Sequence, residues 1–443
     1  MDDAQTHTDG RTGAGRRVLV IAYYFPPMGL SGVQRVAKFV RYLPHYGWHP
    51  DVLTVEPAGY FAYDETLLHE VEDADPLIRR TRSFDPTRLF GKRTVPMPSE
   101  TRRRWWSFLT NLLFVPDNKI GWIPFALRAG HRMMRTHRYD AILSSAPPYT
   151  AHLVGARLSR RHGVPLVVDF RDDWVGNPRH VYPSRLHRWA HQRLERHVLR
   201  RACHALTINE PIRQGLVERN RTAGWAPDVR VLPQGFDPAD FASADFDRCA
   251  PSRTGERLRL VYTGVFYDAQ TPDPFLRALA DFVAYQPEVR SRVEAVFVGI
   301  VPEASQRLAD RLGIADMIRY EGYRTHEATV QHQRDADVLW LTVGRRPGAE
   351  GISTGKLFEY FGARKPILAL VPEGAAQDAL VGHGAALIVP PDDVDAIRRG
   401  LRICYQQWSA GALPVPDEAH VRRFDRQRLA GELAEILESS RTA

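Results

Sequence analysis

One segment late in the chain has the residue types of an anion-binding helix start. Residues 350–359 read EGISTGKLFE and lie between two apolar runs. Ser353 and Thr354 are residue types that cap helices, so the backbone amides of Gly355 to Leu357 would be free to hold an anion such as a diphosphate. This segment is therefore the first candidate for a phosphate site.

A cation and a carboxylate complete this segment. Only five of the 60 basic residues are lysines, and one of them, Lys356, stands at the helix start, where it would reinforce an anion site. Glu359, one turn further along, would accept hydrogen bonds from a ribose diol; the alternative is a solvated carboxylate on a helix surface. The segment is not a P-loop, because Glu350 stands where that motif needs glycine and Leu357 where it needs Ser or Thr.

A second set of functional side chains follows an apolar strand in the first half of the chain. Residues 169–174 read DFRDDW, so three carboxylates surround an arginine and a tryptophan at the edge where open α/β sheets place their ligands. We expect Asp169, Arg171, Asp172 and Trp174 to bind acceptor hydroxyls. The alternative is an ion pair between Arg171 and Asp172 that only locks the loop.

A glycine-containing loop follows the first predicted strand and opens the first predicted helix. Residues 26–33 read PPMGLSGV, and glycines there let the backbone approach a ligand at a helix N-terminus. Gly29, Ser31 and Gly32 are the candidates for donor binding, and a tight turn without a ligand is the alternative. The dinucleotide fingerprint GxGxxG is absent after either first strand, which disfavours a nicotinamide or flavin dehydrogenase.

Strands that alternate with helices must position these loops. The apolar periodicity predicts parallel α/β sheets, and the pattern occurs twice. Two doubly wound, Rossmann-like domains facing one another across a cleft are the simplest architecture. The predicted strands are 18–25, 51–55, 141–145, 166–170, 205–208 and 229–232, then 258–263, 295–298, 318–320, 338–341, 367–371 and 387–389.

The same pattern divides the chain into five parts. We expect a disordered tail at 1–16, an acceptor-binding domain at 17–240 and a linker at 241–256. A second Rossmann-like domain, which contains the candidate phosphate site, follows at 257–415. The last part, 416–443, contains a predicted helix at 421–437 that would pack either back on the first domain or on the second.

Composition limits the class of protein and its partners. The 443 residues are 44% hydrophobic and 25% charged, as in ordinary globular proteins, and no apolar run approaches the ~20 residues that span a bilayer. The sequence shows no signal peptide, and its three cysteines are too widely spaced for a disulfide framework or a zinc site, so we expect a cytoplasmic protein. The net charge of +8 favours an anionic partner.

Two basic stretches are candidates for contact with lipid. Residues 101–135 combine arginines with Trp105, Trp106, Phe108 and Phe114, a mixture typical of interfacial helices on anionic membranes; the alternative is internal packing of these aromatics. Residues 185–201 carry six arginines at helical spacing, which indicates either a solvated face or a second contact with lipid phosphates.

The order and spacing of these motifs resemble the retaining glycosyltransferases of family 4, which have the GT-B fold. Within that family the chain is most similar to the branch that builds bacterial surface polysaccharides. The resemblance rests on residues 26–33, 116–122, 139–148, 169–174, 234–237, 262–264, 321–323 and 355–360.

The resemblance implies a nucleotide diphosphate sugar as co-substrate, bound mainly by the second domain. Tyr323 would lie by the base and Glu359 at the ribose. The diphosphate would lie among Gly29, Ser31, Gly32, Gly264, Ser353, Thr354, Gly355, Lys356 and Leu357.

Catalysis is assigned to Lys356, Asp172 and Glu350. In this family the leaving phosphate itself is thought to help deprotonate the acceptor. Two features depart from the family pattern. Glu350 and Glu359 are separated by one residue more than the family's glutamate pair, and residues 264–268 lack the family's Arg and Lys pair.

The sequence therefore predicts a retaining hexosyl- or related transferase that acts on a saccharide or lipid-linked acceptor in cell-envelope polysaccharide synthesis. We expect it to be peripheral on the inner face of the membrane and to need no cofactor and no metal, because no Asp-x-Asp motif is present. A soluble natural-product acceptor is the alternative. A nucleic-acid-binding protein is a remote one, since no zinc spacing, RNP-type pattern or helix-turn-helix is present.

Overall fold

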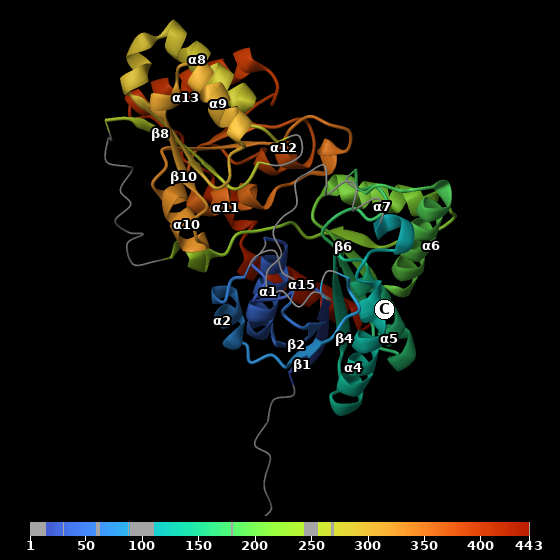
Figure 1. Cartoon of the computed structure of the whole chain (residues 1–443). Coiled ribbons are helices and arrows are strands. Elements are labelled where there is room, and N and C mark those ends of the chain that lie inside the picture. The colour runs from blue at the N-terminus through green and yellow to red at the C-terminus, as the bar shows by residue number, and fades with distance from the viewer. Residues whose placement is uncertain are drawn as a thin grey trace, which may run out of the picture.

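Two parallel sheets form the centres of two lobes (Figure 1). The computed structural model describes residues 15–29, 31–58, 63–86, 88, 110–178, 180–242, 256–266 and 270–442. The predicted tail at 1–16 and the predicted linker at 241–256 fall mostly outside these residues. So do Arg102, Trp105, Trp106 and Phe108 of the first basic stretch.

The N-terminal lobe is built on a seven-stranded sheet in the order β3-β2-β1-β4-β5-β6-β7, with every neighbouring pair parallel. The order reverses direction between β1 and β4, which places a crevice at the carboxyl ends of these strands. The strands are β1 Arg16–Ala22, β2 Trp48–Val55, β3 Ile78–Thr81, β4 Ala141–Ala146, β5 Leu166–Phe170, β6 His204–Thr207 and β7 Val229–Val231.

The C-terminal lobe repeats this design with six parallel strands in the order β10-β9-β8-β11-β12-β13. Its own reversal lies between β8 and β11. The strands are β8 Leu258–Thr263, β9 Val293–Val298, β10 Ile318–Gly322, β11 Val338–Thr342, β12 Ile367–Leu370 and β13 Ala386–Val389.

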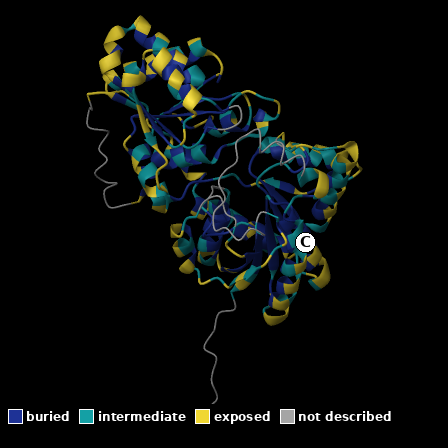
Figure 2. Ribbon diagram, viewed as in Figure 1, coloured by how far each residue is buried: buried dark blue, intermediate teal, exposed yellow. Residues whose placement is uncertain are grey.

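Helices cover both faces of each sheet, so the strands are buried and the outer helix faces are exposed (Figure 2). In the N-terminal lobe they are α1 Ser31–Tyr42, α2 Thr66–Glu72, α4 Ile123–Thr136, α5 Thr150–His162, α6 Arg185–Arg201 and α7 Glu210–Arg221. In the C-terminal lobe they are α8 Asp273–Tyr285, α9 Glu303–Arg311, α10 His326–Arg334, α11 Gly355–Ala363, α12 Ala375–Leu380 and α13 Val394–Ser409.

The chain crosses between the lobes twice, and the two crossings are bonded to each other. Phe236, in the first crossing, donates its amide to the carbonyl of Phe424 at 3.0 Å and accepts from the amide of Arg426 at 3.0 Å. After the short helix α14 Glu418–Arg422, the second crossing leads into α15 Arg426–Ser440, which packs on α1 of the N-terminal lobe. The two connections between the lobes therefore lie side by side.

Helix α15 completes the core of the N-terminal lobe. Its apolar side chains Leu429, Leu433 and Leu437 are at most 1% exposed and share one cluster with Val20 and Val40. Burial on this scale shows that the last helix is an integral part of a lobe whose strands all lie before residue 232.

The predicted fold class is confirmed: the chain is α/β, with two Rossmann-like domains in the GT-B arrangement. The predicted strands are all present, and β3 is an addition. Two local differences concern helices. The first predicted helix, α1, continues after Tyr42 as a 3-10 turn, Leu43–Tyr46. The helix expected at 421–437 is divided, because Asp425 caps the start of α15.

Candidate active site

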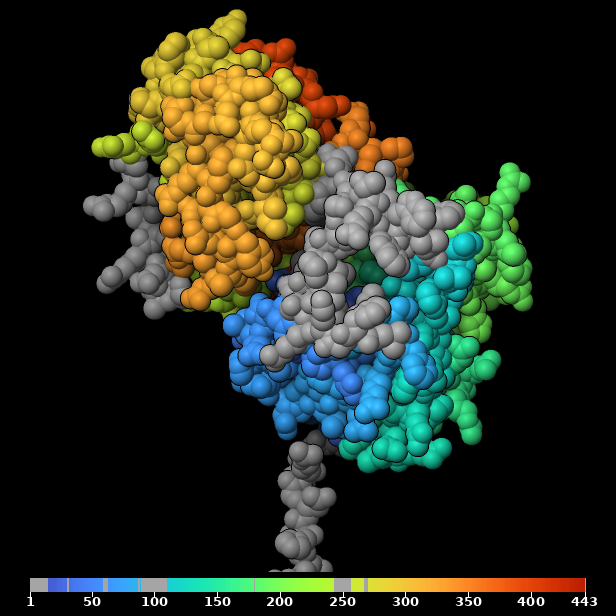
Figure 3. Space-filling model, viewed as in Figure 1, coloured from blue at the N-terminus to red at the C-terminus, as the bar shows by residue number. Residues whose placement is uncertain are grey.

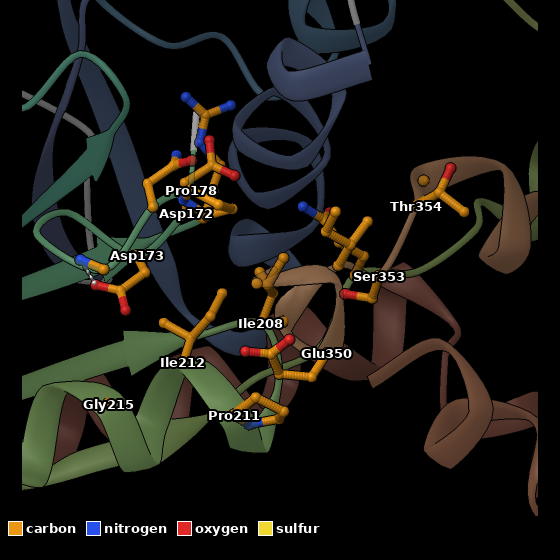
Figure 4. A pocket seen from close by; sticks show the side chains of 18 of the residues that line it. Asp172, Asp173, Pro178, Ile208, Pro211, Ile212, Gly215, Glu350, Ser353 and Thr354 are labelled. Carbon is orange, nitrogen blue, oxygen red and sulfur yellow. Dashed lines mark hydrogen bonds between the residues drawn. The ribbon is translucent and has the colours of Figure 1, made fainter. Parts of the chain in front are cut away.

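A cavity of about 500 Å³ lies where the two lobes meet. Figure 3 shows the lobes in yellow to orange and in blue to green, and Figure 4 shows the cavity from close by. Its volume is in the range of small-molecule sites. The predicted site residues that line it are Gly32, Arg171, Asp172, Glu350, Ser353, Thr354, Gly355 and Glu359.

The first loop approaches the cavity through Gly32. The Arg171 guanidinium donates to the carbonyl oxygens of Gly32, of Ala146 at 3.2 Å and of Pro147 at 2.6 Å. A Cβ atom at position 32 would lie 2.7 Å from Arg171 Nη1, so the contact depends on glycine. Gly29 packs against Asp64 and does not line the cavity. Ser31 begins α1, and nothing further is described of its side chain.

The acceptor segment is only partly exposed to the cavity, and Asp169 corrects our expectation. Asp169 is 1% exposed, and its carboxylate accepts from Arg35 Nη2 at 3.0 Å and from Ser145 Oγ at 2.8 Å. Burial opposes ionisation, but the Arg35 charge and these bonds hold the pKa of Asp169 below its usual range. These bonds make the Asp169 carboxylate an anchor between β5 and α1. Because the carboxylate is buried, an acceptor does not reach it.

Trp174 is a second correction. Its indole is fully buried, stacks on the Tyr149 ring with centroids 4.5 Å apart, and donates from Nε1 to His191 Nδ1 at 3.1 Å. The side chain therefore supports the loop from behind. The alternative of an Arg171–Asp172 ion pair is not seen either, since the Arg171 bonds that the structure gives go to backbone carbonyls.

Asp173 is held by an ion-pair network that the sequence did not suggest. Its carboxylate accepts from Arg219 Nη1 at 2.9 Å, and Arg219 also donates to both oxygens of the buried Glu195. Burial raises the pKa of Glu195 to about 7, against the opposing charge of Arg219. Glu195 also accepts from the amide of Val175 at 3.2 Å, so the network fixes the loop that carries Asp172.

The C-terminal side of the cavity is formed by the start of α11. Thr354 occupies the capping position with an extended backbone, but its side chain makes no capping hydrogen bond. Ser353 instead accepts at Oγ from Asn209 Nδ2 of the opposite lobe at 3.1 Å. The amide of Leu357, expected to be free, donates to the Thr354 carbonyl at 3.1 Å. Within the described residues, the amides of Gly355 and Lys356 have no acceptor.

Lys356 lies beside this helix start without lining the cavity. Its Nζ donates to Tyr262 Oη at 2.5 Å and lies next to Gly264, where a Cβ atom would be 3.0 Å from it. Burial lowers the pKa of Lys356 to about 7, although the Glu359 charge opposes the shift. The lysine thus brings a cation to the end of β8, the place where the expected Arg and Lys pair is missing.

Two carboxylates and one tyrosine complete the predicted set. Glu359 accepts from Gln333 Nε2 at 3.3 Å and faces the cavity, and Glu350 lines it from the turn before α11. Tyr323 corrects our expectation, because it is 73% exposed after the edge strand β10 and does not line the cavity. The Leu357 side chain is buried in the core of the lobe.

Several lining residues were missed by sequence reasoning. Arg346 follows β11 at its carboxyl end, a position that indicates a ligand site, but Arg219 and Arg426 come from helices whose pattern is that of ordinary amphipathic surfaces. Arg426 donates to Gln34 Oε1 at 3.0 Å, across the contact between α15 and α1. Four arginines therefore lie around the cavity: Arg171, Arg219, Arg346 and Arg426.

Neither a metal cluster nor a membrane span is found in the described residues. No group of three or more His, Cys, Asp or Glu side chains in them is placed to hold a metal ion. None of the helices in the same part of the chain is both long and apolar enough to cross a bilayer.

Residues 31–235 match the family description "Glycosyl transferase 4-like domain". This match covers most of the N-terminal lobe and supports the resemblance to family 4. A D-inositol 3-phosphate glycosyltransferase of Streptomyces scabiei is 33% identical over 150 residues, 31% of this chain and 33% of the relative. The enzyme of that name from Streptomyces bingchenggensis is 24% identical over 218 residues, 47% of each chain. The aligned part of the chain spans about a third to a half of the length of these relatives.

Solved structures extend the likeness of the fold to nearly the whole chain. Sucrose-phosphate synthase from Thermosynechococcus elongatus has a TM-score of 0.58 at 16% identity, over 96% of this chain and 98% of that one. The Anabaena protein HepE, in complex with UDP and glucose, gives 0.58 at 16% identity over 96% and 100%. At this identity the likeness establishes the shared two-lobed fold.

Proposed function

We propose that this protein is a retaining glycosyltransferase that moves a sugar from a nucleotide diphosphate sugar to a saccharide or lipid-linked acceptor. The observation that carries the proposal is that the open start of α11 and the Arg171–Asp172 loop of the opposite lobe line one cavity. Such a cavity would hold a donor and an acceptor together, which lowers the barrier to transfer between them.

The donor side rests on charge and backbone geometry. The amides of Gly355 and Lys356 point from a helix N-terminus, a favourable place for phosphate oxygens, and Lys356 adds a cation at Gly264. Glu359 faces the same cavity and would bind the ribose. The fold neighbour HepE is described in complex with UDP, which supports a uridine or related nucleotide as the donor's leaving group.

The acceptor side rests on Asp172 and the loop that carries it. Asp172 and Glu350 approach the cavity from opposite lobes, as Figure 4 shows, and are the carboxylates we assign to acceptor positioning and to sugar positioning. The departing diphosphate would take the acceptor proton, and Lys356 with the α11 amides would stabilise its charge. Retention of configuration is part of this proposal, as are a role in cell-envelope polysaccharide synthesis and a place on the inner face of the membrane.

A second candidate keeps the reaction and changes the acceptor. The curated relatives are named for inositol 3-phosphate, a small phosphorylated polyol, and four arginines lie around the cavity. Guanidinium groups bind phosphate well, so these arginines would meet the phosphate of such an acceptor. A soluble acceptor of this kind, or a natural product, is the alternative that an acceptor panel would detect.

Ligand-induced thermal stabilisation tests the donor site. Melting temperatures measured with UDP, GDP, ADP and their sugar conjugates should rise with one base series, in proportion to ln(1 + [L]/Kd). Glu359→Gln should weaken the shift, whereas Tyr285→Ala on the exposed face of α8 should not change it. No stabilisation by any nucleotide would contradict the assignment of the donor site.

Product analysis tests the reaction. Purified protein given the stabilising donor should transfer sugar to lipid-linked saccharides in washed membranes, and NMR should show the donor's anomeric configuration in the product. Transfer only to soluble polyols or natural products would favour the second candidate, and an inverted product would contradict retention.

A further inference from the structure

Three neighbouring helices of the N-terminal lobe form an arginine-rich face. Helix α4 packs against α5, and α5 packs against α6. Together they carry one carboxylate, Glu195, which is 2% exposed and paired with Arg219. Their twelve arginines are Arg128, Arg132, Arg135, Arg157, Arg160, Arg161, Arg185, Arg188, Arg193, Arg196, Arg200 and Arg201.

These arginines are not neutralised. Ten of the twelve are exposed, and Arg196 and Arg201 are partly exposed. No described carboxylate forms an ion pair with any of the twelve, whereas Arg290 and Arg307 of the C-terminal lobe are paired with Asp316 at 2.6 Å and with Glu303 at 2.8 Å. A surface of this composition attracts anionic partners strongly.

Exposed apolar side chains gather around the start of α6, one of these three helices. Leu113 is 73% exposed, Leu186 68% and Trp189 55%, and they are joined by Leu112 and Val181. Two hydrogen bonds hold the contributing segments together: Asn111 Nδ2 donates to the Val181 carbonyl at 3.0 Å, and His187 Nε2 is 3.3 Å from the Leu112 carbonyl oxygen. We call these five residues, Leu112, Leu113, Val181, Leu186 and Trp189, the apolar cluster.

Cations surround the apolar cluster at close range. The Arg193 guanidinium carbon lies 5.7 Å from the centre of the Trp189 ring, and Arg185 and Arg188 flank Leu186 in sequence. Aromatic and aliphatic side chains rimmed by arginines are the arrangement that enters the boundary between lipid headgroups and acyl chains. Phosphate backbones of nucleic acids would use the arginines but not the aliphatic side chains.

We infer that the face formed by α4, α5 and α6 docks on an anionic lipid bilayer, with the apolar cluster inserted at the interface. Val181 is three residues from Pro178, which lines the cavity, so docking in this way would hold the acceptor side of the cavity next to the membrane. A lipid-linked acceptor could then enter without leaving the bilayer, a consequence that rests on the proposed function. The docking of this face on a membrane does not rest on the proposed transfer reaction.

Co-sedimentation with lipid vesicles tests the inference. Wild-type protein should bind vesicles of phosphatidylcholine mixed with phosphatidylglycerol at least tenfold more tightly than pure phosphatidylcholine, and added salt should weaken the binding. Leu186→Ser plus Trp189→Ser should reduce binding at least tenfold, and so should Arg185→Glu plus Arg188→Glu. Equal binding by wild type and both double variants would overturn the inference.

Matched controls separate docking from folding and from the proposed activity. Tyr285→Ser, at a side chain 78% exposed on the C-terminal lobe, and Arg307→Glu plus Arg311→Glu on α9 should bind vesicles as the wild type does. The variants of the apolar cluster should keep the wild-type melting temperature and the same stabilisation by nucleotides. The test of vesicle binding is then independent of the test of donor binding. Binding to an oligonucleotide that the apolar cluster variants leave unchanged, together with no vesicle binding, would assign this face to nucleic acid instead and overturn the inference.

Discussion

Asn209 of the N-terminal lobe donates to Ser353 of the C-terminal lobe, with Nδ2 and Oγ 3.1 Å apart. The same amide nitrogen donates to the Gly351 carbonyl at 3.0 Å, while Asn209 Oδ1 accepts from the Ile212 amide and caps α7. One side chain therefore begins a helix in one lobe and bonds the site segment of the other. This link joins the two lobes directly beside the cavity, which Gly351 and Ser353 line.

The first prediction separates these two roles of Asn209. Asn209→Asp keeps an oxygen for the α7 cap but loses both donated bonds, each contributing about 0.5–1.5 kcal/mol. We expect the melting temperature to fall by a few degrees, because both bonds are present in the ligand-free fold, and kcat/KM to fall roughly 5- to 100-fold, because the lobes are no longer joined at the site. Steady-state kinetics with melt-checked protein measures this, and an unchanged kcat/KM would show that the link has no role in turnover.

The second prediction concerns Glu359 and Lys356, which should fail in different ways. Glu359→Gln should mainly raise the donor KM, because the ribose does not react and is bound equally in ground and transition states. Lys356→Ala should lower kcat by roughly ten- to a thousandfold if the ammonium supplies about 1.4–4 kcal/mol of charge stabilisation. Normal kinetics for both variants, with lower melting temperatures, would show that these residues only stabilise the structure of α11.

The third prediction follows from the pKa of Lys356, which burial lowers to about 7. A bound diphosphate favours the charged amine and raises this pKa, so binding takes up a proton. UDP affinity should be greatest below pH 7 and fall, by at most about tenfold per pH unit, as the pH rises above 7. Calorimetry in buffers of different ionisation enthalpy measures the uptake, and Lys356→Arg, which stays charged, should abolish it.

The fourth prediction tests the close approach of Gly32 to Arg171. Gly32→Ala would place a Cβ atom 2.7 Å from Arg171 Nη1 and force the guanidinium to move. We expect a higher acceptor KM and a destabilisation of about 1–2 kcal/mol. Gly351→Ala, whose Cβ would meet no atom within 4 Å, is the matched control for the melting temperature. Equal melting curves and kinetics would show that Arg171 adapts freely.

The fifth prediction is that turnover needs no divalent metal. The α11 amides and Lys356 would neutralise the diphosphate, and no three His, Cys, Asp or Glu side chains of the described residues are grouped to hold a metal ion. Activity should therefore persist in EDTA. Complete loss that magnesium or manganese restores would contradict this expectation.

The sequence predicted the strands well because parallel strands buried on both faces are continuous apolar runs, as in β5 and β11. Strand β3 escaped notice because Ile78–Thr81 is a short edge strand with two arginines. Site residues at strand ends, such as Asp172 and Arg346, are predictable from topology.

Other parts of the site depend on contacts distant in sequence. Asp169 belongs to the same motif as Asp172, but its carboxylate is bonded to Arg35, which is 134 residues away in the sequence. Arg426 reaches the cavity only because α15 returns to the N-terminal lobe. No local sequence pattern indicates either of these contacts. A sequence motif therefore identifies candidate site residues, and the tertiary structure determines which of them face the cavity.

The return of α15 has a consequence for dissecting the protein. The N-terminal lobe is discontinuous in the gene product: a fragment that stops before residue 416 would lack Leu429, Leu433 and Leu437 and would expose the apolar surface of α1. We expect such a fragment to aggregate, and the two lobes not to be separable by a single cut. A circular permutant that joins α15 to β1 through a short linker would make the lobe contiguous, since Arg16 and Glu438 already form an ion pair at 3.0 Å.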